Sequence, residues 1–287
     1  MFTRLAAFFR VLRGDSAGNV AVVSLQGPIM PGRRGRQSIN IENTEKLILR
    51  AFSVPDLKAV ALAINSPGGS PVQSALIMQR IRDLADKKNI PVIAFAEDVA
   101  ASGGYMIALA GDEIIAHPAS LVGSIGVIFG GFGFQGALKK HGVERRVHTA
   151  GTKKSFMDPF LPEKKEDVAR LKRLQKDLFQ YFQDLVTERR GKRLKGAKTK
   201  VFNGDIWTGE EAVKLGIIDG IGEMRGVLKE RFGEKVRIIR IAPPRQSVLS
   251  LLSSQDSKAG SGEMGLFSAD DVLNAVEARL HWNRWGF

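Results

Sequence analysis

Short apolar runs that end at glycine, proline or polar residues recur along the chain and predict buried strands. The three clearest runs are "VAVVSLQGPI" (20–29), "KAVALAI" (58–64) and "PVIAFA" (91–96). Four weaker runs predict further strands at 113–117 ("EIIAH"), 124–129 ("SIGVIF"), 142–150 ("GVERRVHTA") and 235–241 ("KVRIIRI").

Apolar residues at helical spacing separate these runs. They predict a helix over 70–87, a short helix over 102–110 that begins at Ser102, and a long helix over 163–189 with one apolar stripe. A further short helix begins near Thr208, with Glu211 at the spacing of a capping box. Strands that alternate with helices favour right-handed crossovers, so we predict an α/β fold with a mostly parallel sheet.

The two ends of the chain differ from this pattern. "MFTRLAAFFRVLRG" predicts a basic amphipathic helix that could lie on a membrane surface or dock on protein. After Pro244 comes a polar linker and then a helix with a capping box from Ser268 to Asp271. The predicted organisation is an N-terminal helix and linker (1–19), one α/β domain (20–245), a flexible linker (246–265) and a C-terminal helix (266–287). We expect neither a transmembrane helix nor a cleavable signal peptide.

Composition and charge exclude several classes of site. The 287 residues include no cysteine and four histidines, none at metal-ligand spacing, so we expect no disulfide and no zinc site. The formal net charge is +13, and residues 139–200 hold 19 Lys/Arg against 8 Asp/Glu. This basic segment fits a solvated helix face, an anionic membrane surface or an acidic partner. It lacks an aromatic stacking platform, so nucleic acid is not an expected partner.

Two strand-to-helix turns carry candidate chemistry. In "NSPGGS" (65–70) the glycine pair can present backbone amides to an oxyanion or a phosphate, or can simply form a tight turn. Ser102 stands at the next such junction, where it could be a nucleophile or a helix N-cap, and its surroundings do not match GxSxG. Because parallel strands end at the same sheet edge, both turns are expected to open to the same side.

A serine nucleophile needs a base. His117, His141 and His148 are poorly placed for this role, whereas the loop "AGTKKSFMDPF" offers Lys153 and Lys154. A lysine can act as a base if burial and neighbouring positive charge lower its pKa from about 10.4 toward about 7–8. Two solvated surface lysines are the alternative, and spacing alone does not choose between the readings.

Three stretches, taken together and in this order, resemble the signal peptide peptidase A (SppA) family of serine proteases: "INSPGGSPVQSA", "VAASGGYMIALAGDEIIAHPASLVGSIGV" and "AGTKKSFMDPF". The resemblance implies a ClpP/crotonase-like fold of repeated ββα units wound into a superhelix. It also implies a Ser–Lys dyad with Ser102 as the nucleophile and Lys154 as the base. Gly69 and Gly103 correspond to the oxyanion donors, and Ser124 to a serine that helps to hold the lysine.

The same resemblance implies an ATP-independent endopeptidase without cofactor or metal, acting on signal peptides or unfolded polypeptide. It implies a homo-oligomeric ring or dome in which neighbouring subunits share each active site. Many members carry an N-terminal transmembrane anchor, where we expect at most a short amphipathic helix in this chain, so the expected location is cytoplasmic, with peripheral contact to the inner face of the membrane as an option. A catalytically inactive membrane-associated scaffold and a crotonase-type acyl-CoA enzyme are the alternatives.

Overall fold

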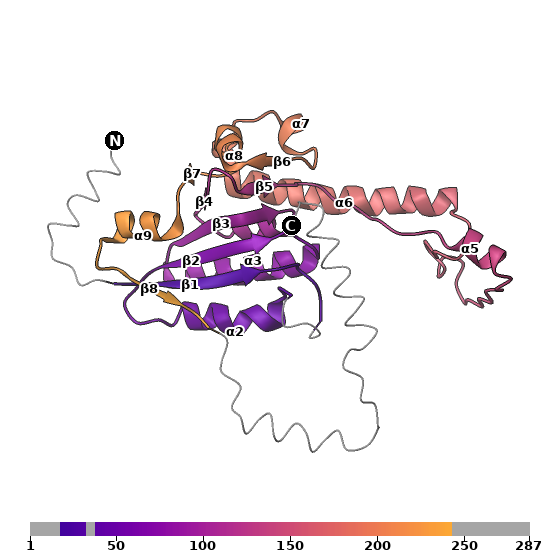
Figure 1. The fold of residues 1–287 in the computed structure, drawn as a ribbon, viewed down its shortest axis with the longest axis horizontal. Helices are drawn as coiled ribbons and strands as arrows, with labels where there is room; N and C mark the ends of the chain where they lie inside the picture. The colour runs from indigo at the N-terminus through magenta and orange to yellow at the C-terminus, as the bar shows by residue number, and fades with distance from the viewer. Residues whose placement is uncertain (1–17, 33–37, 243–287) are drawn as a thin grey trace, which may run out of the picture.

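The computed structural model of this chain describes residues 18–32 and 38–242 (Figure 1). The predicted N-terminal amphipathic helix, the linker over 246–265 and the C-terminal helix lie outside the described residues. The described elements, in chain order, are β1 (Asn19–Gln26), α2 (Ile41–Ala51), β2 (Leu57–Ser66), α3 (Pro71–Lys88), β3 (Val92–Ala101), α4 (Gly103–Ala108), β4 (Glu113–Ala116), β5 (Leu121–Gly123), α5 (Gln135–Lys140), α6 (Lys165–Arg190), the 3-10 turn Gly191–Arg193, α7 (Lys198–Val201), β6 (Ile206–Thr208), α8 (Gly209–Leu215), β7 (Gly220–Ile221), α9 (Met224–Phe232) and β8 (Arg237–Arg240).

A single eight-stranded sheet forms the body, with strand order β6-β5-β3-β2-β1-β8; off this path, β4 pairs with β3 and β7 pairs with β4. Every strand pairing in it is parallel except that of β5 with β6. β3 is longer than predicted because it pairs β4 through residues 93–96 and β5 through residues 99–101. The predicted mostly parallel α/β sheet is confirmed.

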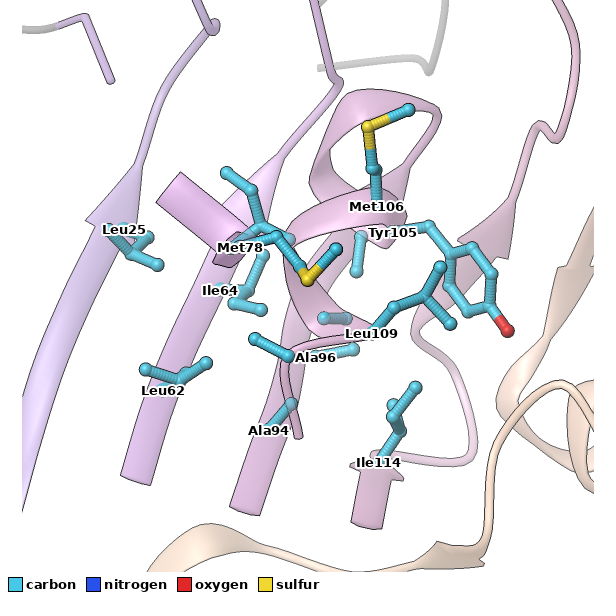
Figure 2. Close-up of a cluster of buried hydrophobic side chains, with 14 of the residues drawn as sticks. Leu25, Leu62, Ile64, Met78, Ala94, Ala96, Tyr105, Met106, Leu109 and Ile114 are labelled. Carbon is cyan, nitrogen blue, oxygen red and sulfur yellow. The ribbon is translucent and has the colours of Figure 1, made fainter. Parts of the chain in front are cut away.

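Both faces of the central strands are buried, which explains why their sequences are nearly continuous apolar runs. Alternate residues of β1 and β2, such as Val23 and Leu62, pack with α2, α3 and α4, while their neighbours, such as Val22 and Ala61, pack against α9. Figure 2 shows Leu62 and Ile64 of β2 on the same side as Met78 of α3 and Leu109, which follows α4. The larger of the two buried clusters therefore lies directly beneath the turns that hold the candidate site.

The helix boundaries follow local capping chemistry. Ser70 caps α3 by accepting a hydrogen bond from the Gln73 amide, and Pro71 occupies the first helical position. α3 ends at Asn89, which adopts the left-handed conformation. The sequence analysis did not identify α2, although Asn40 caps it in the same way.

Three local predictions are wrong. Residues 124–129 do not form a strand, because Ser124 takes a positive φ of 51° and its amide bonds to the Asp205 carbonyl, so the chain leaves the sheet after Gly123. Residues 142–150 do not form a strand either, and all of them are exposed. Thr208 does occupy the N-cap position of α8, but its side chain makes no capping hydrogen bond.

The chain from residue 126 to residue 164, here called the arm, lies outside the body (Figure 1). Figure 1 shows α6 running out from the sheet, with the chain after β5 following it outward and α5 near its far end. Only the C-terminal part of α6 is buried, through Phe182, Leu185, Val186 and Arg190. The predicted apolar stripe of α6 is therefore covered in its second half, whereas Leu174 and Leu178 are each 42% exposed.

Within the described residues, no helix is both long enough and apolar enough to cross a membrane. Over residues 18–32 and 38–242, no three His, Asp or Glu side chains gather in a way that could hold a metal ion.

Candidate active site

Ser102 sits at a strained turn between β3 and α4. Its backbone has φ 51° and ψ −119°, a region that costs a non-glycine residue about 1–3 kcal/mol. Two hydrogen bonds hold the turn: the Ser102 amide donates to the Gly123 carbonyl (2.8 Å), and the Met106 amide donates to the Ser102 carbonyl (2.9 Å). Ser102 thus lies on a sharp strand-to-helix turn, formed here without the GxSxG motif.

The reading of Ser102 as a helix cap is wrong for its side chain. Ser102 occupies the N-cap position of α4, yet its hydroxyl makes no capping hydrogen bond. The residue is partly exposed, whereas every residue of α4 is buried. Ser102 is thus not fully enclosed at the sheet edge, and its hydroxyl is not used to satisfy the helix end.

The Gly68–Gly69 turn lies against Ser102. A Cβ added to Gly68 would stand 2.8 Å from the Ser102 Cβ and 2.9 Å from the Gly103 nitrogen, so only glycine permits this contact. Gly68 has a φ of +99° and Gly69 a φ of +142°. The two turns that the sequence analysis singled out therefore meet at one edge of the sheet.

Ile29 fixes the orientation of Gly69. The Ile29 amide donates to the Gly68 carbonyl (2.8 Å), and the Ser70 amide donates to the Ile29 carbonyl (2.7 Å). In this parallel bridge the Gly69 amide itself points away from Ile29. Its nitrogen is 3.3 Å from the place that a Gly103 Cβ would take, so the Gly69 and Gly103 nitrogens are neighbours. Their arrangement can present two amide donors to one oxygen atom.

Ser124 lies at the end of the neighbouring strand. β5 pairs with the last residues of β3, with Gly123 opposite Ala101, so Ser124 and Ser102 follow paired positions. Ser124 is 6% exposed and has a φ of 51°. The structure thus brings together four of the five predicted site residues: Ser102, Gly69, Gly103 and Ser124.

Lys154 lies elsewhere, on the arm. It is exposed, and its amide donates to the Gly151 carbonyl within a turn (3.2 Å). Lys153 beside it is also exposed. No hydrogen bond joins either lysine to Ser102 in the part of the chain that the structure describes, and the arm extends away from the strand ends (Figure 1).

Aromatic and charged contacts give the arm its own local packing. Phe134 stacks on Phe160 with ring centroids 5.4 Å apart, and the Arg145 guanidinium lies 4.8 Å from the centroid of the same Phe160 ring. The Phe160 amide and Arg145 both donate hydrogen bonds to Asp158, and they lower the pKa of that carboxyl. Large apolar side chains nevertheless stay exposed here, including Ile128 (72%) and Phe132 (76%). An exposed apolar surface of this kind is typical of an interaction face.

The sequence analysis gave no role to two residues that shape the site. Ile29 is the last residue of the first predicted strand, and Ser74 lies within the quoted motif "INSPGGSPVQSA". Ser74 is fully buried, and its hydroxyl oxygen is 2.4 Å from the position of a Gly103 Cβ. The sequence did contain a signal for Ser74: it stands four residues after Ser70, the N-cap of α3, a spacing at which its hydroxyl can bond the Ser70 carbonyl.

Comparisons with known proteins give a matching family model and related chains. Residues 85–235 match the model of peptidase family S49. A putative protease of Synechocystis sp. is 36% identical over 252 residues, which cover 83% of this chain and 85% of that protein. A Brucella abortus protein named as a Na(+)/H(+) antiporter, NhaA, is 48% identical over 271 residues. That match covers 93% of this chain but only 37% of the Brucella protein's length.

Solved structures of a membrane-bound stomatin-specific protease share the fold. A serine-to-alanine mutant aligns with a TM-score of 0.50 at 18% sequence identity, covering 80% of this chain and all of that one. A lysine-to-alanine mutant in complex with a substrate peptide aligns with the same score and identity, covering 85% of this chain and 99% of that one. The expected ClpP-like architecture is confirmed.

Proposed function

We propose that this chain, which belongs to peptidase family S49, the signal peptide peptidase A family, is an ATP-independent serine endopeptidase with a Ser102–Lys154 dyad. The observation that carries the proposal is the meeting of the two turns. Ser102, whose hydroxyl makes no capping hydrogen bond, lies on a strained turn beside the Gly69 and Gly103 amides. Acyl transfer needs a nucleophile next to amide donors for the oxyanion, whereas the binding of a ligand alone does not need that pair.

The reaction follows from this arrangement. The neutral Lys154 amine removes the Ser102 proton as the Ser102 oxygen attacks the peptide carbonyl carbon. The Gly69 and Gly103 amides donate to the resulting oxyanion. The C–N bond then breaks, and the protonated lysine returns its proton to the leaving amine. Water attacks the acyl ester with the same lysine as base, which releases the acid and restores Ser102.

A second copy of the chain supplies the lysine in this proposal. Lys154 is exposed on the arm, whereas Ser102 lies at the edge of the body. Exposed apolar residues on the arm, such as Ile128 and Phe132, and the uncovered Leu174 and Leu178 of α6 offer surface for such an assembly. A homo-oligomer, as expected from the family, would therefore complete each site, and Ser124 would help to hold the incoming amine.

The substrates that we propose are signal peptides and other unfolded or membrane-derived polypeptides. Val72 (61% exposed) and Leu76 (46% exposed) lie on the first turns of α3, directly after the Gly68–Gly69 turn. They offer apolar contacts to a bound peptide. The solved neighbour that holds a substrate peptide supports peptide binding by this fold. Peripheral contact with the inner membrane face stays a prediction, which co-sedimentation with anionic vesicles can test.

Complementation between two inactive variants tests the dyad and the sharing of sites together. Ser102→Ala and Lys154→Ala should each lower the hydrolysis of a fluorogenic apolar peptide by about 10³-fold or more. Lys153→Ala is the matched control and should stay active. Mixed and reassembled in equal amounts, the two inactive variants should regain about a quarter of the sites, because a quarter of the interfaces then pair an intact serine with an intact lysine.

Three outcomes would count against the proposal. Activity that survives Ser102→Ala would remove the nucleophile from the mechanism. Loss of activity in Lys153→Ala together with an active Lys154→Ala would show that the base is the other lysine. Absence of any peptide hydrolysis by the oligomer, together with tight vesicle binding, would favour the scaffold.

A further inference from the structure

Ser74 is buried where α3 meets both turns of the candidate site, the Gly68–Gly69 turn and the Ser102–Gly103 turn. It is the fourth residue of α3 and is 0% exposed. Its hydroxyl donates to the Ser70 carbonyl (2.8 Å), and its amide donates to the same oxygen (3.1 Å). Ser70 follows Gly69 directly, so Ser74 is bonded to the turn that carries the first proposed oxyanion donor.

The same hydroxyl contacts the second turn. A Cβ added to Gly103 would stand 2.4 Å from the Ser74 Oγ, 3.2 Å from the Ile29 Cδ1 and 3.3 Å from the Gly69 nitrogen. The Ser74 oxygen therefore lies against Gly103 on one side while it is bonded to Ser70 on the other. α3 and α4 meet at this point with no side chain on α4 between them.

We propose that Ser74 is a positioning residue that sets the separation of the Gly69 and Gly103 amides. This inference rests on the proposed function, since only an oxyanion makes that separation matter for rate. Amide donors act at about 2.7–3.1 Å from the oxyanion, and a displacement of about 1 Å can cost about 100-fold in rate. A serine hydroxyl is small enough to fit beneath Gly103 and polar enough to bond the Ser70 carbonyl. Alanine loses that bond, and a larger side chain lacks the room.

The test compares Ser74→Ala with a matched change on α2. Thr44 is also the fourth residue of its helix, is 5% exposed, and donates from its hydroxyl to the carbonyl of the N-cap residue Asn40 (2.5 Å). Thr44→Val therefore removes the same kind of hydrogen bond away from Gly103. Both variants are assayed as the full oligomer, kcat is taken per folded subunit, and affinity is measured for a peptide aldehyde, which forms a hemiacetal with Ser102.

Ser74→Ala should lower kcat by about 10- to 100-fold and leave KM within about twofold, because the amides act on the transition state more than on bound substrate. Affinity for the peptide aldehyde should fall by the same factor as kcat, while affinity for the matching peptide alcohol, which cannot form the hemiacetal, should stay unchanged. Thr44→Val should lower the melting temperature and leave kcat per folded subunit unchanged. If Ser74→Ala does not fold, Ser74→Cys is the second variant: it is a weaker donor and sets a larger sulfur atom against Gly103, so it should likewise lower kcat and leave KM within about twofold.

Unchanged kcat and aldehyde affinity in a folded Ser74→Ala or Ser74→Cys oligomer would overturn the inference. An equal loss of affinity for aldehyde and alcohol would also overturn it, because Ser74 would then act on general peptide binding. Failure of the proposed function looks different, since peptide hydrolysis would then persist in Ser102→Ala or be missing from the wild type.

Discussion

Gly103→Ala should destabilise the protein, although alanine is ordinarily the better residue in a helix. Gly103 is the first residue of α4 and does not have a positive φ, so the backbone itself accepts alanine. The new methyl would stand 2.4 Å from the Ser74 Oγ, whereas ordinary contacts begin near 3.4 Å. One of the two atoms must therefore move by about 1 Å in a fully packed region.

The magnitude follows from the ways in which that crowding can be relieved. If Ser74 rotates away, it gives up its bond to the Ser70 carbonyl, which costs about 0.5–1.5 kcal/mol. If it stays, overpacking costs about 1–3 kcal/mol. The higher helix propensity of alanine offsets at most about 1 kcal/mol of this cost. We expect a net loss of about 1–2 kcal/mol, which lowers the melting temperature by about 2–8 °C.

A double-mutant cycle with Ser74→Ala isolates the contact. Removing the Ser74 oxygen leaves the new methyl with its neighbours at 3.2 and 3.3 Å, which need to yield only a few tenths of an ångström. Thermal or urea unfolding of the four proteins should therefore give a coupling energy of about 1–2 kcal/mol between the two positions. Gly103→Ala should cost almost nothing when it is combined with Ser74→Ala.

Two results would refute this reasoning. Gly103→Ala as stable as the wild type would mean that α4 can shift without cost. If Gly103→Ala costs as much in the Ser74→Ala variant as in the wild type, some other contact causes the loss.

Three further predictions concern contacts that hold the body together. Burial raises the pKa of Tyr105, whose hydroxyl donates to the Ile217 carbonyl (2.6 Å), so Tyr105→Phe leaves a buried carbonyl unpaired and should cost about 1–3 kcal/mol in urea unfolding. Burial would raise the pKa of Asp219, but hydrogen bonds, led by the one from Arg190, outweigh burial and lower the pKa. The ionised carboxylate therefore stabilises the fold above the unfolded pKa of about 3.9, and this stabilisation is lost as the pH falls through the folded pKa. That pH dependence should vanish from the stability–pH profile of Asp219→Asn. Hydrogen bonds from two amides of the first turn of α9 lower the pKa of Glu223, and Glu223→Ala should cost about 0.5–2 kcal/mol, with Glu223→Asp retaining part of the cap, as measured by thermal unfolding at neutral pH.

Local pattern alone predicted β1 to β4 and β8 and the helices α3, α4, α6 and α8, but not α9 or the short strands β5, β6 and β7. β1, β2 and β3 are buried on both faces, and a strand of that kind must be apolar at nearly every position, which made all three visible in the sequence. The sequence analysis missed α2, although this helix is amphipathic and buries one side that includes Ile48 and Ala51. Residues 142–150 were wrongly predicted as a strand, because β-branched residues such as Val143 and Val147 indicate a strand only where a neighbouring strand provides hydrogen bonds.

By itself, the sequence determined which residues could carry chemistry. They are a glycine pair in one turn and a serine in the next, both at the carboxyl ends of parallel strands, and a lysine pair in a later loop. Only the tertiary structure decided that Gly68 contacts Ser102, that the Ser102 hydroxyl is not a helix cap, and that the Ser74 hydroxyl lies against Gly103. It also placed Lys154 on an exposed arm, away from the residues that the family resemblance had grouped with it. The physical reason is that local pattern reports the burial and periodicity of each segment, whereas the distance between two segments depends on how the whole sheet and its helices pack.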